Sequence, residues 1–154
     1  MEEKKIKQVN ALESGTVIDH IPSEVLFKVI NILGLEKIET NMTFGMNLES
    51  KRLGKKGIIK ISARFPDDKD LNKIALVAPD AKINIIRDYK VVEKKSVQVP
   101  EKVVGIAKCM NPKCVTNVET NVVTKFNVLK NNGHIDLKCH FCEKITDQQN
   151  IEIN

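Results

Sequence analysis

Residues 15–34, GTVIDHIPSEVLFKVINILG, predict a short strand followed at once by an amphipathic helix. The strand covers Gly15–Ile21, and the Pro-Ser-Glu triplet at 22–24 is a typical helix start. Apolar residues then recur at helical spacing, and Gly34 is a typical C-terminal stop. The fold therefore begins as β then α.

Apolar spacing predicts two further strands and a second helix downstream. Two alternating runs predict strands, with a Gly/Lys-rich turn at 54–57 before the second run. The runs consist of Met42, Phe44, Met46 and Leu48, and of Ile59, Ile61, Ala63 and Phe65. Asp67 or Asp68 can cap a helix that ends before Pro79.

A strand over 81–87 completes the order βαββαβ, and residues 89–92 predict one more strand beside it. This order is that of the ferredoxin-like split βαβ plan, an antiparallel sheet with both helices on one face. The predicted fold class is therefore α+β.

The segment 94–102, KKSVQVPEK, is charged, contains Pro100 and is the best candidate for a domain boundary. It divides the 154 residues into domains of residues 1–100 and 101–154. No apolar run approaches the length of a membrane span, so no membrane partner is expected. The second domain buries too little surface to be stable without additional support.

All four cysteines lie in this second domain, in the patterns C-x4-C and C-x2-C. They are Cys109, Cys114, Cys139 and Cys142, and 24 residues separate the pairs. This spacing is typical of one tetrahedral Zn²⁺ site with four thiolate ligands. Four thiolates leave no position for a reactive water, so the zinc would be structural and part of the folding free energy.

Other uses of the cysteines fit less well. A disulfide framework needs an oxidising compartment, yet the N-terminus, MEEKKIKQVN, lacks the apolar region of a secretory signal, and we expect a cytoplasmic protein. A redox Cys-x-x-Cys leaves the first pair unexplained, and an iron–sulfur centre remains an alternative with the same ligand type. His140 is not needed as a ligand, and His134 is interpreted as a turn residue.

The second domain otherwise predicts strands only. Apolar residues alternate with polar ones in segments 120–130 and 135–139, and a turn at Asn131-Asn132-Gly133 joins the two segments. Ile151 and Ile153 suggest a last short strand. We therefore predict a small all-β domain that is similar in layout to a zinc ribbon.

The net charge of +5 raises the alternative of a nucleic-acid-binding zinc ribbon. The second domain, however, has only 7 Lys and Arg against 6 Asp and Glu, and its only aromatics are Phe126 and Phe141. A nucleic-acid module needs a concentrated basic face to displace counterions. No nucleic-acid partner is therefore expected.

Positive charge in the first domain is more locally arranged. Lys56 and Lys60 fall on one face of a strand and can meet one anionic ligand. Ammonium groups with a histidine suit a polyphosphate, and an aspartate accepts hydrogen bonds from ribose hydroxyls. A solvated lysine-rich surface explains the same residues without a ligand. The chain shows no catalytic constellation, so we do not expect an enzyme.

Several segments resemble the regulatory chain of aspartate carbamoyltransferase. They are GTVIDHIP at 15–22, GKKGIIKI at 54–61, LVAPDA at 76–81, INIIRDYKVV at 83–92 and LKCHFCEK at 137–144. Together with the order of the four cysteines, this similarity covers nearly the whole chain.

The resemblance implies a non-catalytic subunit in pyrimidine biosynthesis. Its first domain would bind nucleoside triphosphates, with CTP as inhibitor, ATP as activator and UTP as a further effector. Its zinc domain would dock onto catalytic chains. Regulatory chains would pair as homodimers through their first domains and bridge two catalytic trimers.

The resemblance also implies which residues contact the nucleotide. The set comprises Ala11, Leu12, Val17, Asp19, His20, Lys56, Lys60, Asn84, Ile86, Tyr89, Val91 and Lys94. Lys94 and His20 would face the phosphates, and Asp19 and Lys60 the ribose and base. Backbone groups near Leu12 and Tyr89 would meet the base edge.

Overall fold

A five-stranded antiparallel sheet dominates the first part of the chain. The structure is a computed structural model that describes residues 12–154. The strands lie in the order β2-β3-β1-β4-β5, which is the ferredoxin-like order with one strand added. Their bounds are β1 Gly15–Pro22, β2 Met42–Ser50, β3 Gly54–Ser62, β4 Lys82–Arg87 and β5 Lys90–Ser96. The predicted α+β fold class is confirmed.

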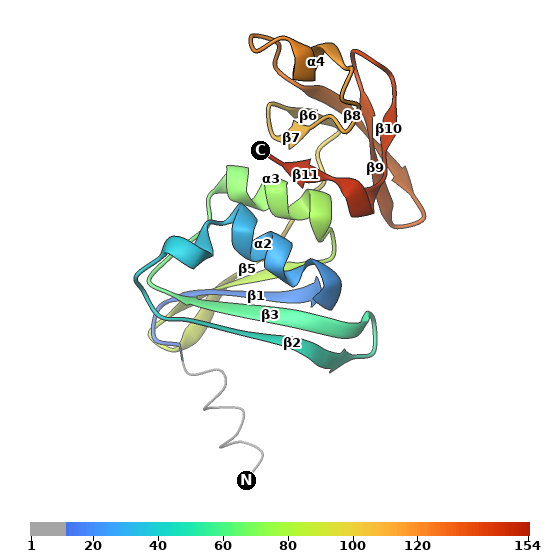
Figure 1. The fold of residues 1–154 in the computed structure, drawn as a ribbon. Helices are drawn as coiled ribbons and strands as arrows, with labels where there is room; N and C mark the ends of the chain where they lie inside the picture. The colour runs from blue at the N-terminus through green and yellow to red at the C-terminus, as the bar shows by residue number, and fades with distance from the viewer. Residues whose placement is uncertain (1–11) are drawn as a thin grey trace.

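Two helices cover one face of this sheet, as Figure 1 shows. The first, α2 Leu26–Ile32, follows a 3-10 turn, η1 Ser23–Val25, and Gly34 turns the chain away with a left-handed φ of 63°. A second 3-10 turn, η2 Leu35–Lys37, comes next. No helix within residues 12–154 is long and apolar enough to cross a membrane.

The second helix, α3 Asp68–Val77, starts with a capping box. The Asp70 amide donates to the Asp67 carboxylate at 2.9 Å, and the Asp67 amide donates to the Asp70 carboxylate at 3.2 Å. Two amides that lack partners within the helix are satisfied in this way. Of the two predicted caps, Asp67 is therefore the one used.

The main apolar core lies between the helices and the sheet. Ile18, Ile59 and Ile83 on the three central strands are fully buried against Leu26 of α2 and Ile74 of α3. Their strand neighbours point to the opposite face, because successive side chains of a strand alternate. That opposite face is covered by no helix or strand among the described residues (Figure 1).

The predicted turn at residues 54–57 was wrong, because this segment forms the beginning of β3. The turn lies at 51–53 instead, where the Leu53 amide donates to the Ser50 hydroxyl at 3.2 Å. Packing explains why residue 57 is a glycine, since a Cβ there would lie 2.8 Å from Cδ1 of Leu26. The glycine permits close approach of the helix and does not mark a turn.

Two predicted strands have different ends in the structure. β3 stops at Ser62, because Ala63 adopts a left-handed φ of 57°, and Phe65 lies outside the strand beneath the Arg87 guanidinium at 4.5 Å. Tyr89 belongs to the turn between β4 and β5, with a φ of 64°, and β5 continues beyond the predicted 89–92 to Ser96. The alternation therefore identified these strands but not their ends.

The second part of the chain is built mainly of short strands. A four-stranded sheet has the order β10-β9-β8-β6, and a separate pair joins β7 to β11. The bounds are β6 Lys102–Val104, β7 Ala107–Lys108, β8 Lys125–Asn131, β9 His134–Cys139, β10 Ile145–Thr146 and β11 Glu152–Ile153. A one-turn helix, α4 Val115–Val118, and a 3-10 turn, η3 Gln148–Asn150, interrupt the strands.

The hairpin of β8 and β9 has the predicted turn. Asn132 and Gly133 both have positive φ, 51° and 79°, as a two-residue type I′ turn requires. β8 starts at Lys125, later than the predicted residue 120. The Thr124 side chain is buried and donates to the Ala107 carbonyl at 2.7 Å, so this residue serves the loop and not the strand ladder.

The two parts of the chain share an interface through α3. Leu76 is fully buried, and it belongs to the apolar cluster that contains Phe126 and Leu137 of the second part. Lys28 of α2 also donates from Nζ to the Gln149 carbonyl of η3 at 3.2 Å. In Figure 1, α3 accordingly lies between the first sheet and the second part.

Candidate functional site

The four cysteine sulfurs converge in the second part of the chain. All four Sγ atoms lie within 4.8 Å of one another. The Cys109–Cys142 and Cys114–Cys139 Sγ–Sγ distances are both 3.7 Å. Four thiolates at ~2.3 Å around one tetrahedral ion would be ~3.8 Å apart, so the sulfurs fit a single metal ion.

Polar groups on neighbouring residues hold the two cysteine loops in place. The Thr116 hydroxyl lies 3.2 Å from the Cys114 sulfur, and the Asn117 amide group donates to the Cys109 carbonyl at 2.8 Å. The Cys139 amide donates to the Lys144 carbonyl at 3.0 Å, which closes the second loop. Such contacts around the ligands orient them before the metal binds.

The thiols differ in how readily they ionise. Burial raises the pKa of Cys109 to about 12, and it also raises the pKa of Cys139. At Cys142 burial acts in the same direction, but hydrogen bonds, first that from the Lys144 amide, outweigh it and lower the pKa to about 7. A cation is therefore needed to hold all four sulfurs as thiolates near neutral pH.

Neither of the histidines in this part of the chain joins the cysteine group. His140 donates its backbone amide to the Lys125 carbonyl at 2.8 Å, and its ring packs edge-on against Phe141. The prediction that His134 is a turn residue was wrong, because His134 is the first residue of β9 and pairs with Asn131 of β8. The geometry thus favours a closed four-sulfur site without a position for substrate.

The predicted nucleotide residues gather on the uncovered face of the first sheet. In an antiparallel sheet, directly paired residues point to the same face. Val17 of β1 pairs with Lys60 of β3 on one side and with Asn84 of β4 on the other, and Asn84 pairs with Lys94 of β5. Four predicted residues from four strands therefore form one row across the sheet.

A second row lies beside the first and is apolar. Ile86 of β4 pairs with Val91 of β5. This pair lies next to the Asn84–Lys94 pair, closer to the turn between the two strands. Val91 and Lys94 are three residues apart and would normally face opposite sides, but the register between β4 and β5 shifts at Val92. This bulge brings both predicted residues to the same face, which no alternation pattern in the sequence indicates.

A second bulge, in β1, determines the positions of Asp19 and His20. The register between β1 and β3 shifts between Ile18 and Ile21, and both isoleucines are fully buried. The two residues between them are therefore displaced, and His20 has a left-handed φ of 58°. The His20 amide donates to the Asp19 carboxylate at 2.7 Å, while its Nδ1 is buried and has no partner among residues 12–154.

Asp19 and the two lysines of β3 form the charged part of this face. Lys56 forms an ion pair with Asp19 at 3.0 Å. Lys60 is nearly buried, and this burial lowers the pKa of its ammonium group, although the nearby Asp19 carboxylate opposes the shift. The predicted convergence of Lys56 and Lys60 on the same face follows from their four-residue spacing.

The remaining predicted residues lie at the margin of this face or outside the described chain. Leu12 is buried, and it lines a cavity of about 640 Å³ over β2 and β3 together with Lys60. The Tyr89 amide donates to the Glu13 carbonyl at 3.0 Å, and 67% of the Tyr89 residue surface is exposed. Ala11 lies outside the described residues.

Lys82 and Ser96 also lie on this face and are absent from the predicted set. Lys82 pairs with Asp19 on one side and with Ser96 on the other. The sequence signal is their place in the register, two residues before Asn84 and two after Lys94. That signal can be used only when the pairing of β1, β4 and β5 is known.

Comparison with known proteins identifies the same family for both parts of the chain. Residues 7–98 match the family described as aspartate carbamoyltransferase regulatory chain, allosteric domain, and residues 101–152 match its metal binding domain. The regulatory chain of Bacteroides fragilis is 54% identical over 152 residues, which is 99% of this chain and 98% of that relative. The regulatory chain of Pyrococcus horikoshii is 49% identical over 149 residues, 96% of this chain and 97% of that relative.

Proposed function

Because the chain belongs to the family of aspartate carbamoyltransferase regulatory chains, we propose that nucleoside triphosphates regulate it at the uncovered face of its first sheet. It is a non-catalytic subunit with an allosteric domain and a metal-binding domain. We assign residues 1–100 to the allosteric domain and residues 101–154 to the metal-binding domain. The proposed effectors are CTP as inhibitor, ATP as activator and UTP.

The observation that carries the nucleotide site is the row of Val17, Lys60, Asn84 and Lys94 next to the Asp19–Lys56 ion pair. Lysine ammonium groups suit a polyphosphate, an aspartate suits ribose hydroxyls, and an amide suits a base edge. The apolar pair Ile86 and Val91 offers a surface for the flat base. One extended nucleotide can meet all of these groups, because they lie on neighbouring strands about 5 Å apart.

We further propose that the metal is Zn²⁺ and that the domain it stabilises contacts catalytic chains of aspartate carbamoyltransferase. Thiolate-only tetrahedral sites favour zinc, and the 3.7 Å sulfur spacing fits its bond length. Exposed apolar side chains near the cysteines support docking, because such groups commonly mark protein interfaces. They are Met110, Val115, Val118, Phe141 and Ile145.

The proposed homodimer would join two first domains and so bridge two catalytic trimers in the cytoplasm. β2 is an edge strand, and Phe44, Met46 and Leu48 on it are partly exposed. An edge strand with apolar side chains is a ready surface for pairing with another chain. The nucleotide would act through linkage, and it can shift activity only by its difference in affinity between two states, typically about 1–3 kcal/mol.

Calorimetric titration of CTP and ATP into the full metal-loaded chain tests the nucleotide site. We expect saturable binding, and an absence of heat at millimolar nucleotide would overturn the proposal. Mixing the chain with catalytic trimers then tests assembly by mass and by nucleotide-sensitive activity. The alternative of a nucleic-acid-binding zinc ribbon is not favoured, because the whole chain matches a regulatory subunit.

A further inference from the structure

Lys82 lies on the face proposed for the nucleotide, at the end of the sheet where Asp19 lies. It is the first residue of β4, and it lies between Asp19 of β1 and Ser96 of β5 in the cross-strand register. Neither Lys82 nor Ser96 belongs to the residues implied by family resemblance. The row Asp19–Lys82–Ser96 runs beside the row Val17–Asn84–Lys94 on the same face.

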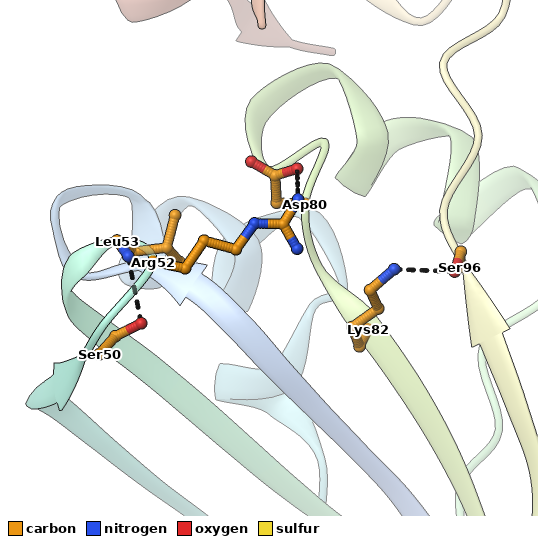
Figure 2. A network of polar contacts seen from close by, with 6 residues as sticks. All are labelled: Ser50, Arg52, Leu53, Asp80, Lys82 and Ser96. Atoms are coloured by element: carbon orange, nitrogen blue, oxygen red, sulfur yellow. Dashed lines mark hydrogen bonds and ion pairs between the residues drawn. The ribbon is translucent and has the colours of Figure 1, made fainter.

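The Lys82 side chain has a defined direction. Its Nζ donates to the Ser96 hydroxyl at 3.1 Å, and Figure 2 shows it extended across from β4 toward β5. The acidic neighbour Asp19 is instead paired with Lys56 at 3.0 Å. The Lys82 charge therefore has no carboxylate partner within residues 12–154, where the other ion pairs are Arg52–Asp80 and Lys95–Glu93.

The position of Lys82 brings its charge close to that of Lys94. Lys82 pairs with Ser96, two residues from Lys94, so Lys82 and Lys94 are diagonal neighbours on adjacent strands, about 7–8 Å apart. Both side chains are longer than half this distance, so their ammonium groups can reach one anion together. An anion with several charges benefits from each added cation, whereas an uncharged base or ribose does not.

We propose that Lys82 is a further residue that contacts the phosphates of the effector and that Ser96 positions its ammonium group. This inference rests on the proposed nucleotide function of the same face. Lys82 and Lys94 approach the phosphates from neighbouring strands. Lys82 therefore contributes to the preference for triphosphates over monophosphates.

The test compares Lys82→Met with the unchanged full-length, metal-loaded chain in calorimetric titrations of CTP and CMP. We expect Lys82→Met to weaken CTP binding about tenfold, the size of one charge-assisted contact, and CMP binding clearly less. Lys82→Arg keeps the charge and should retain most of the CTP affinity. Equal CTP affinity in the unchanged chain and in Lys82→Met overturns the role of Lys82.

Lys95→Met is the matched control for the loss of one positive charge. Lys95 is on the same strand as Ser96, but it pairs with the fully buried Ile83 and therefore belongs to the helix side of the sheet. We expect it to leave CTP affinity within about twofold of the unchanged chain. An equal loss in both variants would assign the effect to net charge and overturn the inference. Failure of the unchanged chain to bind CTP would instead overturn the proposed function itself.

Ser96→Ala tests the positioning role by its dependence on Lys82. We expect a small loss of CTP affinity, about two- to threefold, in the chain that keeps Lys82. The same substitution should have no effect when Lys82→Met is already present, because the hydroxyl acts only through that ammonium group. An equal loss in both backgrounds would show that Ser96 acts independently and would overturn its positioning role.

Discussion

The two parts of the chain differ in where the predicted ligand-binding groups lie relative to the core. In the first part, α2 and α3 cover one face of the sheet, and the predicted nucleotide residues lie on the other face. In the second part, Cys109, Cys114 and Cys139 are themselves buried in the apolar cluster with Phe126. We therefore expect ligand binding and stability to be separable in the first part and inseparable in the second.

The largest effect should come from Cys114→Ala. Removal of one thiolate opens the metal site, and the structural metal contributes about 10 kcal/mol or more to folding of such domains. We expect residues 101–154 to lose their structure and assembly with catalytic trimers to be abolished. Hydrogen exchange measured along the chain reports this loss.

The same Cys114→Ala variant also tests the separation of the two parts. Nucleotide binding to the first domain should remain largely intact, because no cysteine lies on its sheet. Retained assembly in the metal-free variant, or loss of nucleotide binding together with the metal, would contradict the comparison.

Acid should affect the second part before the first. Each thiolate ligand must stay deprotonated, and burial raises the pKa of the free Cys109 thiol to about 12. Protons therefore compete with the metal increasingly as the pH falls from neutral, and the stability held by the metal is lost in that direction. Release of zinc to a coloured chelator, followed against pH, measures this loss. A release profile that stays flat into the acid range would argue against thiolate ligation.

Leu76→Ala should show how far the first part supports the second. The side chain is fully buried in the apolar cluster of the metal domain, so its truncation should cost about 3 kcal/mol in the free energy of unfolding. Denaturant unfolding monitored separately in each domain measures the cost. Leu129→Ala in β8 is the control, and it should cost much less because the Leu129 side chain is exposed. Equal costs would mean that Leu76 does not complete the second core.

Lys60→Ala should weaken nucleotide binding and leave the stability of the fold nearly unchanged. Loss of its ammonium group should weaken CTP binding by about 2 kcal/mol, roughly thirtyfold, with assembly unchanged. Removal of this buried charge also relieves a desolvation cost, which offsets the contacts that the side chain loses, so the free energy of unfolding should change little. Calorimetry and thermal unfolding of the same sample give both values. A variant that binds CTP normally but unfolds more easily would reverse the assignment.

The smallest effect should come from Asp67→Ala. It removes the cap of α3, and such caps are worth about 1 kcal/mol. The loss should appear as a slightly lower thermal midpoint. Asp67→Asn keeps a capping oxygen and should restore most of the stability. Both variants should bind metal and CTP normally, since the cap lies away from both sites.

Local chemistry explains what could be predicted from the sequence. The Asp67 cap, the Asn132-Gly133 turn and the cysteine spacing each depend on a few neighbouring residues. Patterns of this kind can be recognised without knowledge of the partner strand. The α+β class followed from the same local signals, because the order of elements limits the arrangements of the sheet.

The parts that were missed depend on contacts between distant residues. Residue 57 is a glycine because Leu26 packs against it. This contact is not visible in the sequence, where the glycines and lysines of residues 54–57 indicate a turn. Val91 and Lys94 share a face only because of a bulge, and the place of Lys82 on this face depends on its register with Asp19. Pairing between strands determines these positions, and the sequence of a single strand does not reveal it.

The burial of Leu76 in the metal domain also bears on how the chain folds during its synthesis. The ribosome completes α3 well before it adds Cys142, the last metal ligand. A folded first domain can then present Leu76 as a preformed apolar wall on which the later strands assemble. The nascent metal domain would thus depend on two events outside its own sequence, the docking of α3 and the arrival of the metal ion.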